Sequence, residues 1–134
     1  MARVITVEVE QTGSSTSKGT ARTHAVTIDR PVEKGGADAG PLGGELLLLS
    51  LGGCFMSTLL AAINTRAAAV SHVRVHVSAS IGGTPERFES MHLRVTADYA
   101  DADLMRKLID IAERGCLVTN TLRDALVLSV ELAS

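Results

Sequence analysis

Aromatic residues are scarce in this sequence, which has one tyrosine, two phenylalanines and no tryptophan among its 134 residues. The core must therefore be built from aliphatic side chains, which bury less area each than aromatic ones. A chain of this length has room for one modest core, so we expect a single domain over residues 1–134. A core this thin also favours association with a second subunit.

The chain also lacks an excess of positive charge, because its formal net charge is −2 at pH 7. Proteins that bind nucleic acid present a basic surface to the phosphates, so we exclude nucleic acid as a partner. No run of basic, apolar and small residues opens the chain. We therefore expect a protein of the reducing cytoplasm, where paired cysteines are rarely structural disulfides.

An uncharged run from Leu46 to Ile63 is long enough to suggest a membrane span. The run contains glycine, serine and threonine, and the rest of the chain has the pattern of a soluble α+β protein. We therefore predict a buried central helix from Glu45 to about Ala69 and no membrane partner. Leucine and alanine dominate this helix, and it is apolar on nearly all sides, which predicts burial on most sides.

Hydrophobic patterning predicts an α+β fold in which an antiparallel strand hairpin follows that long helix. A second helix, capped by Asp101 or Asp103, should end at Gly115. Alternating apolar residues predict strands at residues 5–10, 25–29, 73–81, 91–98 and 126–132, with a helical turn at 121–125 and loops at 13–19 and 34–44.

The two cysteines are the first candidates for chemistry. A lone free cysteine is more often a buried and inert core residue than a reactive one. The setting of Cys54 and Cys116 favours reactivity, since both adjoin glycine, where another backbone can approach closely. Cys116 also follows the predicted end of a helix, where partial charges can favour a thiolate.

Four short motifs carry a resemblance to a known family: GGADAG at residues 35–40, ELL at 45–47, LGGC at 51–54 and CLVTNTL at 116–122. In this order and spacing they resemble the OsmC/Ohr family of osmotically inducible and organic hydroperoxide resistance proteins. The resemblance implies an α+β fold of antiparallel sheets wrapped around a long central helix, in an intertwined homodimer with its active sites at the subunit interface. It also implies reduction of organic hydroperoxides through a disulfide between Cys54, the attacking thiol, and Cys116, the resolving thiol. A dithiol would then reset the disulfide.

Cys54 needs a cation, because a free cysteine is mostly protonated at neutral pH and a mid-helix position does not favour its thiolate. The resemblance implies an arginine near the first strand connection, held by a glutamate near the start of the central helix. Arg22 is the first choice for this arginine, with Lys18 and Arg30 in reserve. Glu45 is the glutamate candidate. It points away from its own Cys54 along a straight helix, so it serves the partner subunit's site or favours its own helix N-terminus.

The remaining motifs predict neither a metal nor a cofactor. His72 and His76 lie about 13 Å apart along a strand, too far to chelate one ion. His24 and His92 are interpreted as exposed polar residues like them, and no nucleophile elbow or dinucleotide fingerprint is present. Two alternatives to a peroxidase stay open. One is a non-enzymatic protein of the same fold that binds an apolar ligand between subunits, and the other is a thiol redox sensor.

Overall fold

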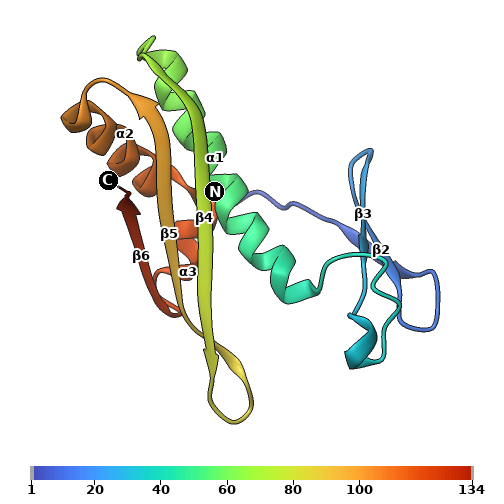
Figure 1. Ribbon diagram of the computed structural model, residues 1–134. Helices are drawn as coiled ribbons and strands as arrows, with labels where there is room; N and C mark the ends of the chain where they lie inside the picture. Colours follow the sequence, from blue (N-terminus) through green and yellow to red (C-terminus); the bar gives the residue numbers. More distant parts are fainter. Residues whose placement is uncertain (1, 134) are drawn as a thin grey trace. The chain divides into compact units, whose positions relative to one another are not determined.

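The computed structural model describes residues 2–133 and divides the chain into two compact units, one ending at Leu47 and the other beginning at Leu48 (Figure 1). The boundary falls inside the long helix α1 (Gly43–Thr65). The prediction of a single domain over residues 1–134 is not tested by this division and stays a prediction.

The N-terminal unit is an antiparallel sheet of β1 (Glu8–Gln11), β2 (Ser17–Ala21) and β3 (His24–Ile28), in the order β1-β2-β3. The strand predicted at residues 5–10 begins later, and the predicted loop at 13–19 is wrong in its second half, where β2 begins. The β2 sequence has no apolar alternation. Its strand conformation is instead decided by hydrogen bonding to a strand on each side.

Asp29 organises the glycine-rich connection that follows β3. This side chain is 2% exposed, and its carboxylate accepts hydrogen bonds from the backbone N–H groups of Arg30, Ala37 and Ala39 at 2.7, 3.1 and 3.1 Å. Thr16 donates its hydroxyl to the same carboxylate at 3.1 Å. Burial alone would raise the pKa of Asp29, but the hydrogen bonds from the three N–H groups and from the Ser15 side chain outweigh burial and lower it to about 2.

Two glycines of this connection are required by close backbone approach. A Cβ atom on Gly36 would lie 1.9 Å from the carbonyl oxygen of Arg30, and one on Gly40 would lie 2.2 Å from that of Thr27. A short 3-10 helix, η1 (Val32–Lys34), lies inside the connection. The sequence predicted an irregular loop here. The segment is instead an ordered connection whose backbone is organised around the Asp29 carboxylate.

The C-terminal unit is a second sheet covered on one face by helices. Its strands β4 (Val70–Gly82) and β5 (Arg87–Tyr99) form the predicted antiparallel hairpin. The chain then passes through α2 (Ala102–Gly115) and α3 (Leu117–Leu122) before β6 (Val127–Leu132). The expectation that all strands pair antiparallel is wrong for β6, because the connection through two helices returns it parallel to β5.

Alternation along the strands places the core on the helical face of this sheet. In β5 the side chains of Met91, Leu93 and Val95 are fully buried or nearly so, whereas His92 and Arg94 lie on the opposite face. Figure 1 shows α1 running beside β4 and α2 beside β5. The helices contribute the rest of the core: Leu51, Phe55, Leu59, Ala62 and Ile63 from α1, and Met105, Leu108, Ile109 and Ala112 from α2.

The ends of the helices follow local capping rules. Asp101 caps α2 by accepting the Leu104 N–H at 3.1 Å, and α2 ends at Gly115 as predicted. Helix α1 ends at Thr65 rather than Ala69, because Ala67 adopts a left-handed conformation with φ of 48° and the Ala68 N–H returns to the Ile63 carbonyl.

Helix α1 is long and apolar enough to cross a membrane by composition, and 33% of its apolar window is buried. The prediction of burial on most sides is wrong for the single chain, because the C-terminal sheet and α2 cover one side of the helix. Leu49 and Leu60 remain 63% and 42% exposed. An apolar face of α1 is thus left open to solvent.

Candidate active site

The structure brings Cys54 and Cys116 together, although they are far apart in the sequence. Cys54 lies half-buried in the middle of α1, and Cys116 lies fully buried at the junction of α2 and α3. The neighbouring residues fix this approach: a methyl group added to Gly115 would lie 3.2 Å from Cγ2 of Thr58, one turn along α1 from Cys54. The two thiols are free, and Cys54 is close enough to Cys116 to affect the ionisation of Cys116.

The environment of Cys116 keeps this thiol protonated. Burial raises the pKa of Cys116, and the Thr119 side chain and N–H group oppose that effect. Cys54 raises it further, as a hydrogen-bond partner and as a neighbouring charge. The expectation that a helix end would favour a thiolate at Cys116 is therefore wrong for the resting state, because burial outweighs the N–H groups.

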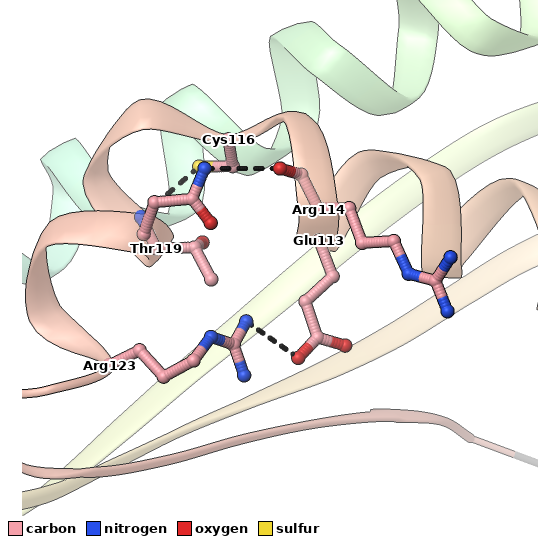
Figure 2. Close-up of polar contacts among 6 residues, drawn as sticks. Glu113, Arg114, Cys116, Thr119 and Arg123 are labelled. Carbon is pink, nitrogen blue, oxygen red and sulfur yellow. Dashed lines mark hydrogen bonds and ion pairs between the residues drawn. The ribbon is translucent and has the colours of Figure 1, made fainter.

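Cys116 also serves as the cap of α3. Its sulfur accepts a hydrogen bond from the Thr119 N–H at 3.5 Å, as Figure 2 shows. This cap explains why α3 begins at Leu117 rather than at residue 121, where the helical turn was predicted. The Cys116 sulfur is held by the same contact that begins the helix.

Two polar contacts tie α3 to α2 around this sulfur (Figure 2). The Asn120 side-chain amide donates to the Arg114 carbonyl at 3.0 Å, which closes the chain over Cys116. Arg123 pairs with Glu113 at 2.9 Å. The guanidinium of Arg123 is therefore already paired with the Glu113 carboxylate.

Arg22 and Glu45 lie in the N-terminal unit. Arg22 is exposed at the first position of the two-residue turn between β2 and β3, where it has a φ of 57°. The Glu45 carboxylate accepts the Leu42 N–H at 2.8 Å, so it closes the N-terminus of its own helix as one half of a capping box. The reserves Lys18 and Arg30 are exposed in the same unit. A role for any of these residues toward Cys54 stays a prediction.

Two of the four histidines, His72 and His92, have local polar partners. His72 lies 2.7 Å from an Asp98 carboxylate oxygen, and His92 contacts Ser129 and Glu131 across the β5–β6 pair. Among residues 2–133, no three histidine, cysteine or acidic side chains gather as a metal site would require. These contacts engage His72 and His92 on the exposed face of the sheet.

The sequence matches the model of the OsmC-like protein family over residues 35–131. The chain belongs to the OsmC-like protein family. This match includes both cysteines, the α1 helix and most of the second sheet, and it confirms the resemblance carried by the four short motifs. A comparison with curated proteins finds no match.

Solved structures of OsmC-like proteins share this fold along nearly the whole chain. The chain is similar to an OsmC-like protein from Mycoplasma pneumoniae, with a TM-score of 0.85, 17% identity and coverage of 99% of this chain and 98% of that one. It is also similar to an organic hydroperoxide resistance protein from Elizabethkingia anophelis, with a TM-score of 0.74, 20% identity and coverage of 99% and 100%. A hypothetical protein from Aquifex aeolicus gives a TM-score of 0.82 at 17% identity, with 98% of each chain covered. These likenesses confirm the predicted α+β OsmC-like fold.

Sequence reasoning missed two residues of this architecture. Thr119 was noted only as part of a motif, although its position three residues after Cys116 is the spacing of a helix cap and its third residue. Asp29 was assigned to the end of a strand. The signal in the sequence is a lone acidic residue directly before a glycine-rich segment. Such a carboxylate can accept hydrogen bonds from several backbone N–H groups of that segment.

Proposed function

We propose that this protein reduces organic hydroperoxides, with Cys54 as the attacking thiol and Cys116 as the resolving thiol. The observation that carries the proposal is the pairing of a half-buried thiol with a fully buried, protonated one inside an OsmC-like fold. Some proteins of similar structure are named organic hydroperoxide resistance proteins, which supports this substrate class.

The reaction balances with these two sulfurs. The Cys54 thiolate attacks the outer peroxide oxygen, the O–O bond breaks, and the alkoxide leaves and takes a proton to become an alcohol. The resulting sulfenic acid condenses with the Cys116 thiol, which forms the disulfide and releases water. A dithiol reductant then restores both thiols and becomes a disulfide itself. Thiols stay reduced in the cytoplasm, which is the compartment we propose.

Three further parts of the proposal concern the setting of Cys54. Arg22 supplies the cation that stabilises its thiolate, since it is an exposed arginine in the turn that connects β2 and β3. Glu45 holds that arginine, in its own or the partner's site. The working unit is a homodimer, because the open apolar face of α1 needs a cover.

Single-turnover kinetics with tert-butyl hydroperoxide test the assignment of the two thiols. Cys54→Ser should abolish peroxide consumption. Cys116→Ser should consume one equivalent and stop at a sulfenic acid, which dimedone traps and mass spectrometry detects. Normal turnover by Cys54→Ser would refute the assignment. Oxidation by peroxide with negligible cycling in the presence of a dithiol would favour the redox sensor, and no thiol oxidation would favour the ligand-binding alternative.

A further inference from the structure

The Thr119 hydroxyl is a buried polar group without a hydrogen-bond partner. Its oxygen is the one buried side-chain nitrogen or oxygen so left in the part of the chain that the structure describes, and the residue is 0% exposed. A buried hydroxyl with no acceptor is unfavourable, and native proteins leave few such groups without a reason. The neighbour that can supply an acceptor is Cys116, whose thiol pKa the Thr119 side chain lowers.

A neutral thiol is a weak acceptor, whereas a thiolate is a strong one. Thr119 therefore gains a hydrogen bond when Cys116 carries a negative charge. Its N–H group already points at the same sulfur at 3.5 Å. The guanidinium of Arg123 is paired with Glu113, and Arg114 is exposed. The hydroxyl and the N–H group of Thr119 are therefore the hydrogen-bond donors placed to stabilise a negative charge on Cys116.

We infer that Thr119 is a positioning residue that stabilises Cys116 as the leaving thiolate when the disulfide is reduced, so that the reductant enters at Cys54. This inference rests on the thiol cycle proposed above. The exposures of the two cysteines agree with it, because Cys116 is 0% exposed and Cys54 is half-buried. A thiol–disulfide exchange is faster at an accessible sulfur and with a more stable leaving thiolate.

The step is balanced with a dithiol as the reductant. One reductant thiolate attacks the Cys54 sulfur, the Cys54–Cys116 bond breaks, and Cys116 leaves as a thiolate that receives the hydrogen bond of Thr119. The second reductant thiol loses its proton to Cys116 and attacks the reductant sulfur of the mixed disulfide. This second exchange releases Cys54 and leaves the reductant as a cyclic disulfide.

The entry point can be trapped directly. The full chain is oxidised with diamide, which makes the disulfide without a peroxide, and is then mixed with 2-mercaptoethanol and quenched in acid within milliseconds. Peptide mass spectrometry should find the mercaptoethanol adduct on Cys54 and a free thiol at Cys116. An adduct on Cys116 in the earliest samples would overturn the inference.

Variants of Thr119 test the leaving-group role. Thr119→Val keeps the shape and the N–H group but removes the hydroxyl, so reduction of the disulfide by dithiothreitol should slow about three- to tenfold. Thr119→Ser restores a hydroxyl and should recover most of the rate. The first oxidation step, in which peroxide converts Cys54 to a sulfenic acid, should keep its rate in both variants, because that step uses the Cys54 thiolate and not Cys116. Equal reduction rates in Thr119→Val and the native protein would overturn the role.

A direct titration separates this role from a merely structural one. In a Cys54→Ser background, Thr119→Val should raise the pKa of Cys116 and Thr119→Ser should not, and circular dichroism should show that all variants are folded. If peroxide fails to oxidise the protein but the diamide-made disulfide behaves as described, the proposed function fails and the role of Thr119 stands. If diamide makes no intramolecular disulfide, both are refuted.

Discussion

The open face of α1 predicts how strongly two subunits associate. Leu49 and Leu60 are 63% and 42% exposed, which together amount to about one whole leucine side chain. Burying one such side chain contributes about 1.5–3 kcal/mol. A twofold interface buries it twice, so these residues contribute about 3–6 kcal/mol per dimer. The double variant Leu49→Ala, Leu60→Ala should therefore weaken dimerisation by roughly a hundred- to ten-thousand-fold.

Sedimentation velocity over a dilution series measures this change in the dissociation constant. The matched control is Val127→Ala on β6, because Val127 is 71% exposed but lies on the face of the sheet that carries Ser129 and Glu131, away from α1. The control should leave the dissociation constant unchanged, and circular dichroism should show both proteins folded. A double variant that dimerises as tightly as the native protein would refute the reasoning that α1 is covered by a second copy.

Three further predictions concern single residues. Arg22→Met should slow the reaction of Cys54 with peroxide at pH 7 and recover at higher pH, where the thiol ionises unaided, whereas Lys18→Met should not; an unchanged rate in stopped-flow assays of Arg22→Met would exclude this cation. Because the pKa of Asp29 is lowered from 3.8 to about 2, its stabilisation is full above pH 3.8 and is lost as the pH falls toward 2. Asp29→Asn should remove that part of the acid sensitivity, and denaturant titrations at several pH values would contradict this if native and variant lost stability in parallel. Gly52→Ala should lower the free energy of unfolding by up to about 2 kcal/mol, because the new Cβ would lie 2.9 Å from Val77 Cγ2. The cost of this overpacking exceeds the gain of about 1 kcal/mol in helix propensity. A variant that is more stable than the native protein in urea titrations would contradict this prediction.

Local signals in the sequence were sufficient wherever a rule acts over a few residues. The alternation in β4 and β5, the Asp101 cap and the stop at Gly115 were predicted from such signals and are confirmed. The short strand β2 was missed because its residues have no periodic pattern, and its pairing with two neighbouring strands decides its conformation. Strand β6 alternates like the others, but alternation carries no information on whether a pair is parallel or antiparallel.

In the candidate site, too, short motifs predicted the residues, whereas their ionisation depends on the packing of the folded chain. The motifs identified both cysteines, and the structure brings those two residues together. The ionisation of Cys116 could not be predicted, because the N–H groups at the start of α3 favour a thiolate and burial opposes one. The relative size of the two effects depends on how α1 and α3 enclose the sulfur, which no spacing in the sequence expresses.

The Asp29 connection also limits how this chain can change by mutation. The Asp29 carboxylate holds main-chain N–H groups at Arg30, Ala37 and Ala39, so the side chains at those positions take no part in the contacts. Substitutions there by residues other than proline, which lacks the N–H group, are compatible with the same loop. An insertion or deletion between Asp29 and Ala39 moves the N–H groups out of register with one fixed carboxylate. The length of this segment and the glycine at Gly36 are therefore its constrained properties, and a grafted loop would need to preserve both.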